Sequence, residues 1–305
     1  MGSPLATVAA ILLGVGMIAV GENLGPYYQT LIGMGAAYLI SALGYSFALQ
    51  FAGQFLFCQA AFMAIGAYTL AMLEPHIGEV AAFAVGAALS GITGLVLGAG
   101  LLRVEDIYLA ILTLAFGQAV LLVPNVWGST GGENGIAVDL SGGNAYIVAS
   151  VCAVVALIFL ARLLRSRLGR HLALTRANPA LGRSCGVSVS RVKILAVGVA
   201  GLLGGIGGMC LAGVLTFITP DNFPLSLTLL LLAAIVIGNR SLVGTVVGVA
   251  IMSTLADLAP STGNTGEYIS AAVLFVALVI QNNTMTRALL DRVIADLQRR
   301  VGARD

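Results

Sequence analysis

The sequence predicts an all-α polytopic membrane protein with about ten transmembrane helices. Of its 305 residues, 59% are hydrophobic and only 9% are charged, and the mean hydropathy is +1.01. A soluble domain carries about a quarter charged residues, so this composition excludes a water-soluble globular enzyme and a disordered protein. A spanning helix needs about 20 apolar residues, so one transmembrane domain of roughly ten spans fills residues 1–305.

Apolar runs along the chain supply ten candidate spans. The first run has no Lys or Arg before it, which a signal peptide would need, so we interpret it as a span. The eighth and tenth runs are shorter than a bilayer-spanning helix usually is, so the count needs an independent test. The runs are Leu5 to Val20, Thr30 to Leu49, Phe55 to Leu73, Val80 to Leu102, Ile107 to Val123, Ala145 to Leu164, Ile194 to Leu215, Leu225 to Gly238, Leu242 to Ala259 and Tyr268 to Ile280.

The placement of basic residues provides that test. Lys and Arg concentrate in cytoplasmic loops, and ten spans with both termini inside place all 15 basic residues on the cytoplasmic side. Removing one span after Lys193 would separate the C-terminal arginines from the central basic loop, so we expect a tight cytoplasmic hairpin at Asn239-Arg240. The break at Gln50 to Gln54 carries no charge that fixes its side. We expect a cytoplasmic loop at 165–193 and a basic cytoplasmic tail at 283–305.

Small residues recur at helical spacing in several spans. Such stripes allow helix backbones to approach closely in lipid, where burying apolar surface against another helix gains little over burying it against lipid tails. The stripes are Gly86, Ser90, Gly94 and Gly98, then Gly201 and Gly205, Gly204 and Gly208, and Gly244 and Gly248. They predict a compact bundle.

Several kinds of chemistry are excluded by missing residues. The only lysine, Lys193, follows Val192, so the chain has no P-loop and cannot hydrolyse ATP by that route. His76 and His171 fall on opposite sides of the predicted membrane, and the four cysteines have no metal-like spacing. No acidic residue lies deep in a span, which disfavours a proton- or sodium-coupled transporter. These absences predict a membrane protein without enzyme activity and without a cofactor of its own.

The central basic loop contains signals for a short helix. Asn178 is a good N-cap, Pro179 fits the first helical position, and Gly186 suits the left-handed residue that ends a helix. A helix of about two turns is unstable alone in water, so neighbouring structure or a partner must hold it. A solvated loop whose arginines set topology and touch anionic lipid remains an equally good interpretation of the local sequence.

Three stretches carry a resemblance to a known family. They are Gly169 to Lys193, Ala42 to Tyr68 with the run AAFMAIGAY, and Tyr108 to Ile136 with the runs YLAILTLAFG and TGGENGI. Together they resemble permease subunits of ATP-binding-cassette importers of the branched-chain amino acid type, and the third resembles the LivM-like member of the usual LivH and LivM pair. The likeness covers most of the chain from about Ala42 to Leu258. The chain departs from the family pattern at Leu56, Cys58-Gln59 and Pro179.

The resemblance implies a ten-helix type II importer half in a bacterial inner membrane. It implies four kinds of partner: a LivH-like second permease, two ATP-binding subunits, an extracytoplasmic substrate-binding protein and membrane lipid, with no nucleic acid. Substrates would be branched-chain amino acids or related small polar or amide solutes, moved by alternating access. The loop Gly169 to Lys193 would dock into the ATPase. Its candidate contact residues are Arg170, Arg176, Asn178, Pro179, Leu181, Arg183 and Gly186.

Polar groups within apolar spans are candidates for the substrate pathway: Gln59, Tyr68, Thr113 and Gln118. Each could equally be a hydrogen-bonding contact between helices, because Thr, Gln and Tyr often have that role in membranes. Two other functions stay open. One is a channel or facilitator for a small neutral solute such as urea, which would need no docking helix, and the other is a structural subunit without a path of its own.

Overall fold

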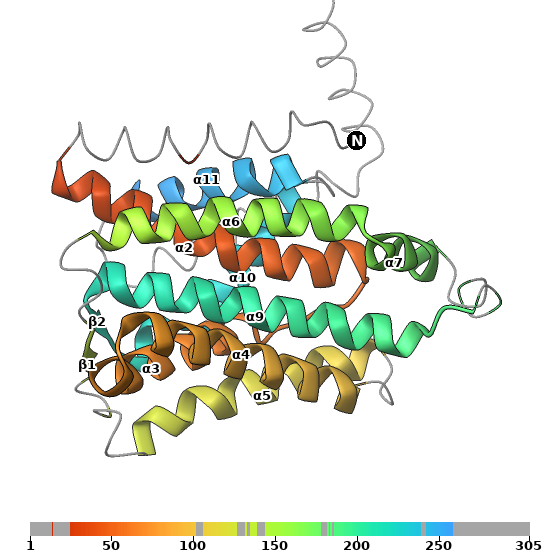
Figure 1. Ribbon diagram of the computed structural model, residues 1–305, viewed down its shortest axis with the longest axis horizontal. Helices are drawn as coiled ribbons and strands as arrows, with labels where there is room; N and C mark the ends of the chain where they lie inside the picture. The colour runs from red at the N-terminus through yellow and green to blue at the C-terminus, as the bar shows by residue number, and fades with distance from the viewer. Residues whose placement is uncertain are drawn as a thin grey trace, which may run out of the picture.

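In the computed structural model, helix α9 (Val189–Leu215) runs through the middle of a helical bundle. Helices α2 (Pro26–Ser46), α3 (Gln59–Ile77), α4 (Glu79–Leu101) and α6 (Ala145–Arg165) all contact it (Figure 1). Almost three quarters of the most apolar stretch of α9 is buried inside the protein, as expected for a helix that other helices surround.

Glycines allow these helices to approach α9 at backbone distance. A Cβ added to Gly201 would lie 2.6 Å from the carbonyl oxygen of Ser90 in α4, and one added to Gly207 would lie 2.7 Å from that of Ala37 in α2. Such spacing excludes any larger side chain at either position. The stripes expected on α4 and α9 therefore face each other, which confirms the close packing predicted from their spacing.

Helix α2 continues into a π-helical turn, η1 (Phe47–Phe51). Gly33 near its start lies against Val214 and Tyr146, whereas η1 contacts α7 (Arg167–Ala177). The end of the bundle formed by α7, the last turn of α6 and the first turn of α9 carries Arg162 to Lys193. We call it the basic end and the other the opposite end. In Figure 1 the basic end is at the right.

Helix α3 begins midway between the two ends. The side-chain amide of Gln59, the first residue of α3, donates a hydrogen bond to the carbonyl oxygen of Ala200. At 1.5 Å per residue, Ala200 lies about 16 Å along α9 from Val189 at the basic end. The seven residues from Ala52 to Cys58 lead from η1 back to this level without forming a helix. The predicted span Phe55 to Leu73 thus starts four residues later than expected and crosses only the half toward the opposite end.

Helix α10 (Leu225–Ile237) complements α3, because it begins at the same level and runs toward the basic end. Thr228 in its first turns accepts a hydrogen bond from the backbone of Ala60, and the carbonyl oxygen of Ile235 accepts one from Gln50 in η1. Helix α11 (Leu242–Leu258) then returns beside it, with Gly248 against Ala234. The short length of the eighth predicted span therefore reflects a helix that starts midway.

The remaining elements close the opposite end and one edge. Helix α5 (Asp106–Val126) contacts α3 and the 3-10 turn η5 (Pro220–Asn222) and lies at the edge of the bundle (Figure 1). Strand β1 (Ile136–Ala137) pairs antiparallel with β2 (Phe217–Ile218), which links the connection after α5 to the connection after α9.

The structure describes residues 14, 25–101, 106–126, 132, 135–138, 144–177, 182, 184, 186–238 and 242–258. Within this part, five helices are long and apolar enough to cross a membrane, and two shorter helices are also apolar. The predicted class, an all-helical polytopic membrane protein, is confirmed. The candidate spans at Leu5 to Val20 and Tyr268 to Ile280 and the hairpin Asn239-Arg240 lie outside the described residues, so the count of ten stays a prediction.

Candidate functional site

The non-helical segment 52–58 is the centre of the candidate site, and we call it the break. Gly53 has φ +72°, a left-handed conformation in which glycine avoids the penalty of a Cβ, and it turns the chain out of η1. The side chains of Leu56 and Cys58 are fully buried, whereas Phe55 is half exposed. Irregular backbone at membrane depth is tolerated only inside protein or beside a water-filled cavity, so the break marks a special position.

Thr113 on α5 satisfies one backbone group of the break. Its Oγ1 accepts a hydrogen bond of 3.1 Å from the Phe57 N–H and donates one of 2.9 Å to the Ala110 carbonyl oxygen. Gly117, one turn later, lies against the backbone of Phe57 and Cys58. The edge helix α5 is therefore joined to the bundle at the break itself.

Gln59 connects three helices at the start of α3. Its side-chain nitrogen lies 3.1 Å from the Ser41 carbonyl oxygen, 3.0 Å from the Ser41 hydroxyl and 3.3 Å from the Ala200 carbonyl oxygen. The amide therefore bridges α2 and α9, while its oxygen has no hydrogen-bond partner among the described residues. Gly204 permits this approach, because an added Cβ would lie 2.8 Å from the Gln59 nitrogen.

Two helix N-termini meet beside the break. The Ala60 N–H donates a 3.0 Å hydrogen bond to Thr228 Oγ1, so the first turn of α3 is bonded to the first turns of α10. Each N-terminus carries the positive end of a helix dipole. In membrane transporters, helices interrupted halfway across present such ends and unpaired backbone groups to substrates and ions.

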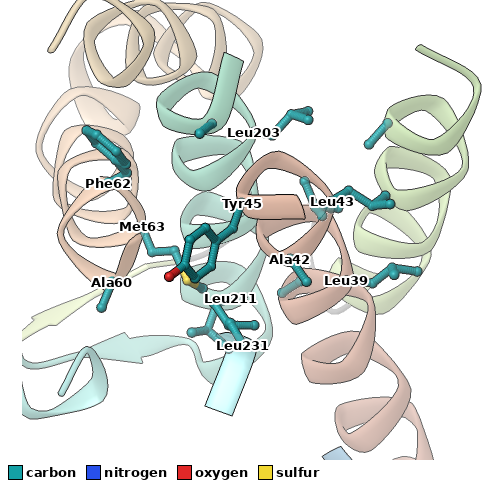
Figure 2. Packing of buried hydrophobic residues seen from close by; sticks show 14 of the residues in the cluster. Leu39, Ala42, Leu43, Tyr45, Ala60, Phe62, Met63, Leu203, Leu211 and Leu231 are labelled. Atoms are coloured by element: carbon teal, nitrogen blue, oxygen red, sulfur yellow. The ribbon is translucent and has the colours of Figure 1, made fainter. Parts of the chain in front are cut away.

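Buried polar atoms without a hydrogen-bond partner in the described part of the chain gather here. They are Tyr45 Oη, Gln54 Oε1 and Gln59 Oε1, and a fourth, Tyr68 Oη, lies farther along α3. Figure 2 shows the Tyr45 side chain reaching from α2 with its hydroxyl directed toward α3. Buried polar groups are normally hydrogen-bonded, so a cluster of unsatisfied ones sets this level of the bundle apart.

A second polar cluster lies between the break and the basic end. Ser46 Oγ donates to Gln50 Oε1 at 3.2 Å and lies 3.5 Å from Thr245 Oγ1, and Gln50 Nε2 donates to the Ile235 carbonyl oxygen at 2.8 Å. The cluster joins α2, η1, α10 and α11. Sequence reasoning missed it, although Ser46 and Gln50, one turn apart near the end of an apolar run, were the signal.

A cavity of about 390 Å³ lies between α3, α4 and α5. Its walls are almost entirely apolar, with Tyr68 and Thr69 as the polar residue types, and the Thr69 hydroxyl already donates to the Ile65 carbonyl oxygen. The cavity therefore offers little to hydrogen-bond a charged or hydroxylated solute.

The structure brings together two of the four candidate pathway residues. Gln59 and Thr113 both lie at the break and make hydrogen bonds between helices. Tyr68 lines the cavity, on the same side of the bundle as Asp221 in η5. Gln118 is exposed on the face of α5 away from the bundle, among the exposed residues Ile111, Leu114 and Leu122.

At the basic end, Arg170 and Arg176 belong to α7, a helix that sequence reasoning missed. Its signal was Ser166, whose hydroxyl oxygen accepts a hydrogen bond from the Leu168 N–H. Gly186 has φ +76°, and the Val187 N–H donates to the Gly182 carbonyl oxygen, which is the helix-ending geometry expected there. Asn178, Pro179, Leu181 and Arg183 lie outside the described residues.

Comparison with known proteins bears on this geometry. Residues 27–281 match the family model described as branched-chain amino acid transport system / permease component. The high-affinity branched-chain amino acid transport system permease protein LivM of Salmonella typhimurium and that of Escherichia coli K12 are each 29% identical over 238 residues. That alignment covers 66% of this chain and 56% of either LivM, so the chain spans a little over half the length of these relatives.

The ribose import permease protein RbsC of Escherichia coli K12 is 27% identical over 224 residues, which is 68% of each chain. No solved structure matches. The family match covers most of the chain, including every described helix apart from the first residue of α2. The chain is a multi-pass membrane protein that belongs to the family of permease components of branched-chain amino acid transport systems.

Proposed function

We propose that the chain is a permease subunit of an ATP-binding-cassette importer that moves branched-chain amino acids or related small solutes by alternating access. The observation that carries the proposal is the meeting of α3 and α10 halfway across the bundle, beside the break. Two helices that cover complementary halves of the membrane resemble the interrupted helices around which transporters build their sites.

The chemistry of the break favours an amino acid with an apolar side chain over a sugar. Phe55, Leu56 and Cys58 are apolar, and the unpaired polar atoms near them in the described part of the chain are three, Tyr45 Oη, Gln54 Oε1 and Gln59 Oε1. A ribose has more hydroxyls than these atoms can pair. A carboxylate would be attracted by the two helix N-termini, and the apolar surroundings would receive an aliphatic side chain. The RbsC relative makes ribose the natural competitor in a test.

Among the pathway candidates, we propose that Gln59 and Thr113 shape the break and that Gln118 faces either the path or the second permease. An amide exposed to lipid at the middle of a helix is costly, so the Gln118 face of α5 needs water or protein beside it. Tyr68 would act near the opposite end, where Asp221 and η5 lie.

The proposed partners follow from the family. They are a LivH-like second permease, two subunits that would bind and hydrolyse ATP, an extracytoplasmic substrate-binding protein and membrane lipid. We propose that the basic end faces the cytoplasm of a bacterial inner membrane, since basic residues resist translocation. Closure of the ATPase would press on the loop containing Asn178 to Gly186, and α7 would pass the movement to η1, which it contacts.

Uptake of labelled leucine, ribose and urea into proteoliposomes that hold the chain with these partners tests the proposal. ATP-dependent leucine uptake, abolished by combined Asn178→Asp, Pro179→Gly and Arg183→Glu changes, is the expected result. Arg299→Glu with Arg300→Glu, in the predicted tail, is the control for altered charge and should leave uptake unchanged. ATP-dependent ribose uptake would overturn the substrate assignment. ATP-independent equilibration of urea, insensitive to the loop changes, would replace the importer by a facilitator.

A further inference from the structure

The stretch from the last turn of α6 to the first turn of α9, at the basic end, carries a strong excess of positive charge. Between Asp139 and Asp221 the sequence contains eight Arg or Lys residues and no Asp or Glu. Every Arg and Lys in the described part of the chain lies between Arg162 and Lys193. The charge is therefore concentrated at one level of the bundle.

Helix α7 presents part of this charge on an amphipathic face. Leu172 and Thr175 are buried against the bundle, and Gly182 lies against Thr175 on that inner side. On the outer side, Arg167 and Arg170 are exposed together with Leu174, whose side chain is 45% exposed. We call Arg167, Arg170 and Leu174 the outer face of α7. Basic residues beside an exposed leucine are typical of a helix at a membrane surface.

The position of this face follows from its connection to two apolar helices. Arg162 and Arg165 lie in the last turn of α6, and Arg191 lies in the first turn of α9, so these residues mark the edge of the apolar region. The Arg170 side chain donates to the Arg165 carbonyl oxygen at 3.2 Å, which holds the start of α7 at the end of α6. The outer face of α7 therefore lies at the depth of lipid headgroups.

We infer that the outer face of α7 binds the headgroups of anionic phospholipids. The phosphates complement the arginine charges, and the upper part of an acyl chain covers Leu174. A lipid surface suits the outer face better than a soluble ATPase, because α7 follows α6 with only Ser166 between them and Leu174 is exposed beside the arginines. Each guanidinium has five donors, so Arg170 can bond a phosphate while it bonds Arg165.

Lipid retention by the purified full chain tests this inference without any transport measurement. The chain is stripped of lipid in detergent, offered phosphatidylglycerol or phosphatidylcholine, and its bound lipid and melting temperature are measured. The native chain should retain phosphatidylglycerol preferentially. Because each basic residue contributes roughly a factor of five to binding at an anionic surface, Arg167→Gln with Arg170→Gln should weaken this preference about tenfold or more.

Two further variants separate charge from other effects. Arg167→Lys with Arg170→Lys keeps the charges and should keep most of the preference. Arg287→Gln with Arg292→Gln removes the same charge from the predicted tail and should leave the preference unchanged. Raising the salt concentration should weaken phosphatidylglycerol retention. Inorganic phosphate, added to the same total negative charge as the lipid, should compete poorly because it lacks an acyl chain.

The inference is overturned if the native chain retains both lipids equally, or if the tail variant loses the preference as the α7 variant does. If inorganic phosphate competed as well as the lipid, the site would be an anion site without preference for a lipid. A glutamine variant that keeps its lipid preference but no longer binds the ATP-binding subunits would assign the outer face to the ATPase instead. None of these results depends on leucine uptake, so failure here leaves the transport proposal intact.

Discussion

The α9 side and the α5 side of the bundle are built in different ways. On the α9 side, glycines bring the backbones of α2, α3 and α4 within reach of α9, and little side-chain volume separates them. On the α5 side, one helix is joined to the rest through Thr113, Gly117 and contacts with α3 and η5. The difference suggests that α9 holds the fold together, while α5, the break and α10 form the part that changes shape.

Adding side-chain volume on the α9 side should have the largest effect on the yield of folded protein. Gly201→Leu would drive a side chain into the Ser90 carbonyl oxygen, which lies 2.6 Å from the position of an added Cβ. Overpacking costs about 1–3 kcal/mol even where side chains can shift, and a backbone obstacle raises that cost. We expect little monodisperse protein by size-exclusion chromatography. Gly100→Leu is the matched control, since no atom lies within 4 Å of its added Cβ, and normal yield is expected there. Similar yields for both variants would contradict the comparison.

Removing the Gln59 amide should come next. Gln59→Leu removes the hydrogen bonds that join α3 to Ser41 in α2 and Ala200 in α9. Each is worth about 0.5–1.5 kcal/mol, because the two carbonyl oxygens keep their intrahelical bonds. We expect a lower melting temperature in detergent. Gln118→Leu is the control on the α5 side and should leave the melting temperature unchanged while it reduces leucine uptake. A stable Gln59→Leu protein would remove Gln59 as a connection between helices.

Thr113→Val tests the joint between α5 and the break. The change removes the acceptor of the Phe57 N–H, so we expect a loss of stability of about 1 kcal/mol and a larger fractional loss of uptake. Thr93→Val is the control, because Thr93 is only partly buried and its hydroxyl donates to the Leu89 carbonyl oxygen in its own helix. Melting curves and uptake measured on the same preparations separate the two effects. Equal behaviour of both variants would argue against a special role for this joint.

The smallest effect on stability is expected for Tyr68→Phe. The Tyr68 hydroxyl has no hydrogen-bond partner among the described residues, so removing it should change the melting temperature little or raise it slightly. Uptake of leucine should nevertheless fall if the hydroxyl acts near Asp221 during transport. Unchanged leucine uptake would show that the Tyr68 hydroxyl has no role in the substrate pathway.

The sequence was sufficient for features that depend on local composition. Hydropathy located the apolar helices within a few residues but not α7, and small-residue spacing identified the faces of α4 and α9 that touch. Hydropathy could not predict the late start of α3, because the break is as apolar as a span. The position of the break along the bundle follows from its contacts with α9. Gln59 and Thr113 were chosen as polar residues in apolar runs, but their hydrogen bonds to α2, α9 and Phe57 depend on tertiary packing.

The pairing of β1 with β2 has a consequence for the order of biosynthesis. Ile136 pairs with Ile218, and α6, α7 and α9 are all made between these two strands. Closing so long a loop is entropically costly, so the pair forms only after those helices have inserted and found one another. Ala137 and Phe217 lie opposite each other in the register. A disulfide between cysteines at these two positions would therefore form only in chains whose insertion is complete. Its formation in newly made protein would show when membrane assembly finishes.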